Sequence, residues 1–347
     1  MQASQRQESF SLYVGISGLV LGFLIGIIVF QGRDAPIFGG LSIGLVAGLA
    51  ATFCGSIAFL LAYLPTLPKV AGGWFARTVR VIDVFAMTFA HVAIVFLALF
   101  GTASVFQMAF DGLSLDNIAS SAVVAGIVAT VSYILYSSGG NIRTSTIPIL
   151  LITLMLFGAM TSMLTADNKE WWQDNFSALG GGSGVSASTF NITMIIAGII
   201  LTTMSNYLAD ELIALAPIHR LGKRWKIKII RSILAMMGLS LVLLGLVDVA
   251  MSVFVHNIGA YGLGILFIVL IAALPYLLPG LPWVFYAVSF AMLGGLVAAL
   301  VLVAPVGYLN ITAFELIAAG IVFVWFTLFV RQLSSFETDV AAGDISE

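Results

Sequence analysis

Long runs of apolar residues, separated by short polar or Pro- and Gly-containing segments, recur along this chain of 347 residues. Uncharged runs of about 20 residues are typical of transmembrane helices, because a helix of that length crosses the hydrocarbon core of a bilayer. Strands of a membrane barrel would instead alternate apolar and polar residues. The pattern predicts about ten membrane-spanning helices, near residues 12–31, 38–64, 81–107, 117–138, 147–165, 189–214, 229–254, 258–274, 283–304 and 309–330.

The composition agrees with an all-α integral membrane protein. The chain is 61% hydrophobic and only 9% charged, with a mean hydropathy of +1.12. Soluble domains carry about 25% charged residues, so this chain could not cover itself with a water-facing surface and must contact membrane lipids. A net charge of −2 gives no reason to expect a nucleic-acid partner. The sequence does not identify protein partners.

Lysine and arginine are distributed unevenly between the predicted connections. With the N-terminus on the cytoplasmic side, twelve lie inside and two outside, and such a positive-inside bias sets the orientation of membrane proteins. We therefore predict that both termini are cytoplasmic and that the loop near 165–188 faces out. Ten spans would also divide into two sets of five with inverted topology, as in many transporters. We expect one polytopic domain over 1–333, with N-terminal helices in 1–146, six more in 147–333, and an acidic cytoplasmic tail at 334–347.

Two connections carry a distinctive composition. The segment "HRLGKRWKIKIIR", residues 219–231, is the strongest basic cluster. A topology-determining cytoplasmic loop is the favoured interpretation, and a site for anionic lipids or a partner is the alternative. The segment "LPYLLPGLPW" contains Pro275, Pro279 and Pro282, which predict an interruption of regular helix there. A tight turn is favoured over an unwound segment that lines a cavity.

Ionisable side chains inside apolar spans are costly unless paired or hydrated, so they are functional candidates. Asp248 and Glu315 are expected in the outer parts of the seventh and tenth spans, with His256 at the outer boundary of the seventh. A pocket shared by these groups and a purely structural pairing of His256 with either acid are both compatible with the sequence. Asp83 and His91 of the third span are secondary candidates, and a hydrogen-bonded packing role is favoured for His91.

Other sequence signals are weak. No nucleotide-binding loop, redox CxxC pair or paired-histidine metal motif is present, so we predict no metal and no cofactor. The glycines of "GLVLGFLIG" and "GGGSG" lack the strand-turn-helix context of a phosphate site. The single cysteine, Cys54, can form no internal disulfide. Asn175, Asn191 and Asn310 match N-x-S/T, which matters only if the protein follows a glycosylating route.

The segment "TADNKEWWQDNFSALGGGSGVSASTF", residues 165–190, is a polar interruption between two apolar spans. Trp171 and Trp172 predict an anchor at the membrane interface, where indole rings are enriched. The glycines at 180–184 let the backbone turn sharply before the next span. We predict that this loop forms a lid or rim over an outward-facing polar pocket.

The order of residues in this segment resembles an uncharacterised prokaryotic membrane family, domain of unknown function 998. Its members commonly show a Ser-x-Leu-Gly element, then Phe-Asn at the start of the next span, then a glycine within that span. The matching positions are Ser177, Leu179, Gly180, Phe190, Asn191 and Gly198. The later stretch "GLSLVLLGLVDVAMSVFVHNIGAY" resembles that family's glycine-rich span with a histidine after it, here His256. The resemblance covers about residues 150–333, and it implies a multi-pass protein of a prokaryotic cytoplasmic membrane without supplying an activity.

These observations favour a non-enzymatic membrane protein that transports or handles a small solute or a lipid. The candidate pocket comprises Ser177, Asn191, Asp248, His256 and Glu315. One alternative is a membrane-embedded enzyme acting on a lipid-linked substrate at the outer leaflet, with His256 as general base oriented by a carboxylate. In the weaker version of that alternative, Ser177 is the nucleophile. A non-catalytic assembly subunit is the third class.

Overall fold

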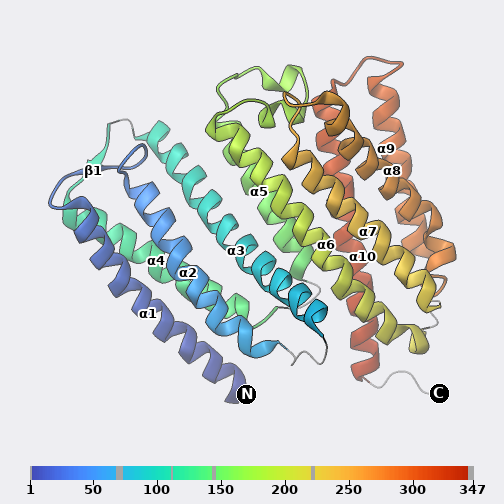
Figure 1. The fold of residues 1–347 in the computed structure, drawn as a ribbon, viewed down its shortest axis with the longest axis horizontal. Helices are drawn as coiled ribbons and strands as arrows, with labels where there is room; N and C mark the ends of the chain where they lie inside the picture. The colour runs from blue at the N-terminus through green and yellow to red at the C-terminus, as the bar shows by residue number, and fades with distance from the viewer. Residues whose placement is uncertain (1, 68–72, 111, 143–145, 220–222, 343–347) are drawn as a thin grey trace. The chain divides into compact units, whose positions relative to one another are not determined.

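The computed structural model describes the chain apart from residues 1, 68–72, 111, 143–145, 220–222 and 343–347. In the part of the chain that it describes, ten helices are long and apolar enough to cross a membrane. The prediction of a helical, multi-pass membrane protein is therefore confirmed (Figure 1). The chain divides into two compact units. Unit 1 comprises 1–142 and 156–164, and unit 2 comprises 143–155 and 165–347.

The described residues of unit 1 form four complete α-helices, and α5 (Ile147–Leu164) contributes its second half to this unit and its first half to unit 2. Two strands of two residues each pair antiparallel, with Ala35 opposite Leu115. The strands join the connection after residue 30 to the one before residue 117; elements so short leave no periodic signal in the sequence. The elements are α1 (Gln2–Phe30), β1 (Ala35–Pro36), α2 (Ile43–Tyr63), η1 (Leu64–Thr66), α3 (Trp74–Ala109), β2 (Ser114–Leu115) and α4 (Asn117–Gly139).

Helices α1 and α4 pack closely along a row of small residues. Gly18, Gly22 and Gly26 of α1 lie on one helical face, and a Cβ added at Gly26 would lie 2.7 Å from atoms of Ser121 in α4. Small residues at this spacing let two helix backbones approach, which is how helices associate where water supplies no hydrophobic force between them. The glycine pattern "GLVLGFLIG" is therefore a helix-packing surface.

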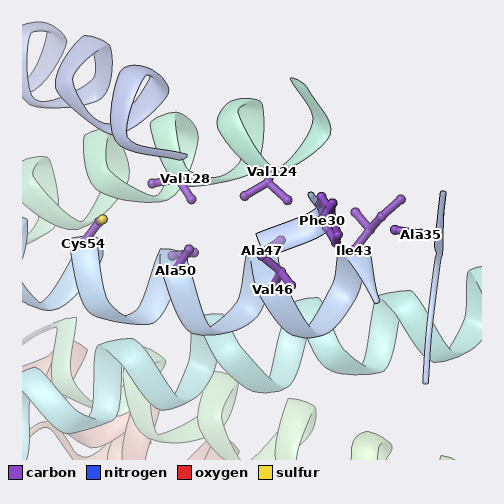
Figure 2. Close-up of a cluster of buried hydrophobic side chains, with 10 residues drawn as sticks. Phe30, Ala35, Ile43, Val46, Ala47, Ala50, Cys54, Val124 and Val128 are labelled. Carbon is purple, nitrogen blue, oxygen red and sulfur yellow. The ribbon is translucent and has the colours of Figure 1, made fainter. Parts of the chain in front are cut away.

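A cluster of buried apolar side chains lies where α1, α2 and α4 meet (Figure 2). Phe30 at the end of α1 is buried together with Ala47 of α2 and with Val124 and Val128 of α4. The lone cysteine, Cys54, belongs to the same cluster and is buried. Small residues of α2 at this position leave room for the larger side chains of its neighbours, so the cluster fills without long side chains on every helix.

Besides the first half of α5, the described residues of unit 2 form the loop 165–184, which contains two short 3-10 helices, and five long helices. The elements are η3 (Trp171–Gln173), η4 (Phe176–Gly180), α6 (Val185–His219), α7 (Arg224–Leu246), α8 (Val253–Leu277), α9 (Trp283–Val303) and α10 (Ile311–Ala342). Helix α10 continues to Ala342, so residues 334–342 of the predicted tail are helical. Helix α8 continues through Pro275 to Leu277, so the predicted interruption begins only after that residue.

The predicted end of the seventh span is wrong by about two turns. We expected α7 to reach residue 254, but it ends at Leu246, and Ser252 caps α8 by accepting the N–H of Val255. The backbone of Val247 is extended, which ends the helix. The connecting residues after it are mostly apolar, so hydropathy alone gave no sign of the break.

Helices α6 and α7 approach as closely as α1 and α4 do. A Cβ at Gly238 of α7 would lie 2.6 Å from the carbonyl oxygen of Gly198, and one at Gly245 would lie 2.4 Å from that of Asn191. Gly245 lies seven residues after Gly238 in α7, and Asn191 lies seven residues before Gly198 in α6. This equal spacing in opposite chain directions fixes the register of the antiparallel helix pair. This register brings Asn191 to the last turn of α7.

The tryptophan at position 325 forms the centre of a second core in unit 2. Trp325 of α10 is fully buried, stacks on Phe329 at 4.9 Å between ring centroids, and meets Phe267 of α8 edge-on at 5.5 Å. Its indole N–H donates to the hydroxyl of Ser289 in α9 at 2.9 Å. One buried side chain thus joins three helices, and its only polar atom has a partner.

Candidate functional site

The candidate residues of unit 2 gather at one end, which we call the loop end. It is formed by the loop 165–184, the connection 247–252 and the residues 304–310 that precede α10. Side chains of α6, of α10 and of its N-cap hold the loop by hydrogen bonds to its backbone. Figure 1 shows this loop, in green, above the start of α6.

Glu315 joins α10 to the loop. It lies just over one turn into α10, is half-buried, and its Oε2 accepts the backbone N–H of Phe176 at 2.5 Å. A carboxylate that accepts a backbone N–H away from water makes a strong, charge-assisted hydrogen bond. The acid predicted inside the tenth span therefore has a partner, and that partner is the loop backbone rather than another side chain.

Asn310 makes a second connection between α10 and the loop. Its side-chain Nδ2 donates to the carbonyl of Trp172 at 2.9 Å, while its Oδ1 accepts the N–H of Ala313. The second bond caps the N-terminus of α10, a position where asparagine is favoured. One side chain therefore both starts the helix and fixes the loop beside it.

Asn191 holds the other end of the loop against α6. Its Nδ2 donates to the carbonyl of Gly180 at 3.0 Å. A Cβ at Gly180 would lie 2.5 Å from Asn191 Oδ1 and 2.7 Å from the ring of Phe190, so only glycine permits this approach. The Leu-Gly and Phe-Asn elements singled out in the sequence are therefore in direct contact with each other.

Aromatic rings fill the space under the loop backbone. The ring of Phe176 meets Phe190 edge-on at 5.2 Å and Trp171 at 6.2 Å between centroids. Trp171 is half-buried, whereas Trp172 is 50% exposed. The two adjacent tryptophans thus have different environments, and only Trp172 has the exposure expected of an interfacial anchor. The anchor role itself stays a prediction.

His256 and Asp248 do not occupy the positions that we predicted. Asp248 lies in the connection after α7, where its Oδ1 accepts the N–H of Met251 at 2.8 Å, so it is no residue of the seventh span. His256 lies in the first turn of α8, is 3% exposed, and its Nδ1 contacts the carbonyl oxygen of Val247 at 2.9 Å. The partner that orients this histidine is a backbone carbonyl, not a carboxylate as in the structural pairing and in the enzyme alternative.

Several buried polar atoms at the loop end have no hydrogen-bond partner within the described part of the chain. They are Asn175 Oδ1 at the N-cap of η4, Asn191 Oδ1 in α6, His256 Nε2 in α8 and Thr312 Oγ1 in α10. An unsatisfied buried polar atom costs about 1–3 kcal/mol, so such atoms are rare in folded proteins and call for a ligand or a water molecule. The loop end therefore has unused capacity for hydrogen bonds.

Some residues of the loop end carry a signal in the sequence, and others do not. Ser177 lies half-buried in η4, beside the Phe176 backbone that Glu315 binds. The roles of Asn310 and Thr312 were missed, although an asparagine before an apolar run is a typical signal for a helix start. The asparagine of all three N-x-S/T matches lies at the loop end, and the side-chain amides of Asn191 and Asn310 bond within the protein.

The secondary candidates Asp83 and His91 both lie on α3 in unit 1. His91 is buried, with Nδ1 2.8 Å from the carbonyl oxygen of Met87 and Nε2 3.0 Å from the hydroxyl of Ser138 in α4. Its ring packs on Phe59 of α2 at 4.4 Å between centroids. With both nitrogens satisfied, His91 has the contacts of a packing residue that joins α2, α3 and α4, as the sequence favoured.

A metal centre finds no support in the residues that the structure describes, which contain no cluster of three or more His, Cys, Asp or Glu side chains suited to an ion. Comparison of the chain with known protein families, curated proteins and solved structures gives no match. The resemblance to domain of unknown function 998 therefore stays a prediction. The residues that suggested it have identifiable contacts: Gly180 against Asn191, Gly198 against Gly238, and His256 on the carbonyl of Val247.

Proposed function

We propose that this protein carries or handles a small solute or a lipid, which binds at the loop end of unit 2. The observation that carries this proposal is the set of four buried polar atoms without a partner among the described residues. They come from α6, α8, α10 and the loop, so a ligand that satisfies them would be enclosed by several helices. Sites of this kind, with a few polar groups in apolar surroundings, are typical of small-molecule binding.

The loop 165–184 is suited to act as a cover over such a site. Its backbone accepts hydrogen bonds from the side chains of Ser186, Asn191 and Asn310 and donates one to Glu315. These few bonds can break and reform without unfolding a helix, so the loop can open and close while the bundle stays intact. A cover of this kind separates a bound ligand from the aqueous phase.

The proposed topology has both termini in the cytoplasm and the loop end outside. The distribution of lysine and arginine supports it, and it would make the two sets of five spans inverted in orientation. Single cysteines introduced in a Cys54→Ala background test it, at exposed Ser183 in the loop and at exposed Gln5 near the N-terminus. A membrane-impermeant thiol reagent added outside should label position 183 and spare position 5; the reverse pattern would refute the topology. The resemblance described above favours a prokaryotic cytoplasmic membrane.

Binding is tested by native mass spectrometry of the protein extracted in mild detergent. We expect a solute or lipid to remain bound to the wild type, and we expect Glu315→Leu to release it because the cover loses its hydrogen bond to α10. Glu170→Gln, an exposed change in the same loop, is the matched control and should retain the ligand. A wild-type protein without any retained molecule would overturn the proposal.

An enzyme is the second candidate, and one observation favours it. The contact of His256 Nδ1 with the Val247 carbonyl leaves Nε2 as the atom that could accept a proton, which is how general-base histidines are oriented. Proteoliposomes prepared from the cell's own lipids distinguish the two functions. A carrier leaves every lipid chemically unchanged, whereas an enzyme produces a new species that disappears in His256→Asn.

A further inference from the structure

We propose that the ligand of the loop end presents a primary ammonium group, which is received by His256 Nε2, Asn191 Oδ1 and Thr312 Oγ1. This inference rests on the proposed function and specifies its ligand. The three atoms are buried and lack a partner within the described residues. They lie on α8, α6 and α10, each within the first two turns of its helix at the loop end.

The hydrogen bonds of His256 determine what its free nitrogen can do. The carbonyl of Val247 only accepts, so the hydrogen of the neutral ring lies on Nδ1. Nε2 then carries a lone pair and accepts a hydrogen bond. Because the residue is 3% exposed, that lone pair requires a donor from a ligand or an enclosed water.

The amide of Asn191 is oriented in the same way. Its Nδ2 donates to the carbonyl of Gly180, which leaves Oδ1 as an acceptor. The backbone of Asn191 lies against Gly245, and His256 binds the carbonyl of Val247 only two residues further along. Both acceptors therefore adjoin the same end of α7.

The balance of donors and acceptors selects the ligand's chemistry. The unpartnered atoms at the described loop end are acceptors, apart from the hydroxyl of Thr312, which can act in either sense. An ammonium group brings three donors and no acceptor, so it matches them. A phosphate or carboxylate would bring further acceptors, and a hydroxyl would bring lone pairs that themselves need donors.

The charges around the loop end also favour a cation. Within 165–184 the loop carries Asp167, Glu170 and Asp174 against the single Lys169. Asp248 and Glu315 add two more carboxyl groups at the same end of unit 2. The resulting negative potential would attract a positively charged group and repel an anion.

The ammonium group could belong to a lipid headgroup or to a free amine, and the experiment separates these sources. The full chain is placed in nanodiscs that contain either phosphatidylethanolamine or phosphatidylglycerol, and retained lipids are counted by native mass spectrometry. In parallel, ethanolamine and glycerol are titrated against the detergent-solubilised protein, with thermal unfolding as the readout. Retention of phosphatidylethanolamine alone identifies a lipid ligand, and stabilisation by ethanolamine identifies a free amine; either result supports the proposal.

Two variants remove acceptors with little change to the fold. In His256→Asn, the amide nitrogen takes the place of Nδ1 and keeps the hydrogen bond to Val247, while Nε2 is lost. Thr312→Val is isosteric and removes a hydroxyl that has no partner in the described structure. Each should weaken binding of the amine probe about tenfold or more, which is the effect of losing one hydrogen bond to a charged group. His91→Asn, in unit 1, is the matched control and should leave binding unchanged.

The outcomes separate the inference from the proposed function. If phosphatidylglycerol or glycerol binds as tightly and this binding also depends on His256, the ammonium assignment is wrong and the proposed function stands. If neither variant changes the binding of any probe or of a retained natural ligand, water molecules satisfy the acceptors and both proposals are wrong.

Discussion

The carboxylate of Glu315 accepts the backbone N–H of Phe176 at 2.5 Å, across 139 residues of sequence. This bond explains how an acid tolerates an otherwise apolar helix, because its charge meets a polarised N–H. It also means that the loop and α10 depend on each other. A substitution at either residue should therefore alter the structure around the other.

Replacement of Glu315 by leucine should loosen the loop without unfolding the helices. The substitution removes a charge-assisted bond and leaves the Phe176 N–H unpaired, at a cost of about 1.5–3 kcal/mol. Hydrogen–deuterium exchange should rise at residues 165–184 and stay unchanged in α7. Glu170→Gln serves as the control, and equal exchange in the two variants would contradict the role of the bond.

Gly180→Ala should displace the loop from α6. The added methyl group would lie 2.5 Å from Asn191 Oδ1, so a neighbour must move, and such overpacking costs about 1–3 kcal/mol. Gly181→Ala is the adjacent control, because its Cβ would meet only the carbonyl of Ala178 at 3.5 Å. Thermal unfolding should separate the two variants, and equal melting temperatures would show that the close approach is not required.

Gly238→Ala should destabilise the pairing of α6 with α7. A methyl group there would lie 2.2 Å from the hydroxyl of Thr202 and 2.6 Å from the carbonyl oxygen of Gly198. We expect a loss of about 1–3 kcal/mol from strain. The same change at Gly264 of α8 meets nothing within 4 Å and should be neutral or slightly stabilising, because alanine favours helix over glycine. A melting temperature for Gly238→Ala at or above that of Gly264→Ala would refute this packing.

Ser289→Ala should weaken the core of unit 2. It leaves the buried indole N–H of Trp325 without its partner, which costs about 1–3 kcal/mol. Ser17→Ala changes an exposed serine that bonds only within its own helix and should have an effect close to zero. The comparison uses melting temperatures, and tryptophan fluorescence should report the changed environment of the indole.

Lys226→Met should act on stability as well as on membrane orientation. The ammonium of Lys226 donates to the carbonyl of Tyr276 at 2.5 Å and lies 3.7 Å from the centre of its ring, so α7 is joined to the end of α8. We expect a loss of about 0.5–1.5 kcal/mol, since the contact is exposed. Lys228→Met removes an exposed charge of the same segment and is the control. If both variants alter only the insertion of the protein, the basic segment acts through topology alone.

The ends of a helix could be predicted from the sequence only at positions where polarity changes. Runs of apolar residues located ten spans because crossing a bilayer requires about 20 apolar residues in succession. The end of α7 was misplaced because the turn at 247–252 is itself mostly apolar, and Asp248 was consequently assigned to a helix. The end of α10 was misplaced for the opposite reason, since the helix continues into polar residues where hydropathy falls.

The site was predicted in part, and the reason lies in what each residue contacts. The cost of burying a charge in an apolar span drew attention to Glu315 from the sequence alone, and the family resemblance drew attention to His256. Sequence could not supply their partners, the Phe176 N–H and the Val247 carbonyl, because backbone groups are present at every residue. Asn310 and Thr312 carry no charge, so nothing in hydropathy distinguished them.

Membrane insertion, helix number and the polar character of the loop 165–184 follow from the sequence by itself, because they depend on the solubility of each segment in lipid or water. The tertiary structure decided which residues meet. It placed Gly180 against Asn191 and Gly238 against Gly198, where the absence of a side chain permits contact between backbones. It also placed the unpartnered atoms of Asn191, His256 and Thr312 at one end of unit 2. These contacts and placements depend on the register between helices, and register is set by the shapes of packed surfaces, not by the polarity of any one segment.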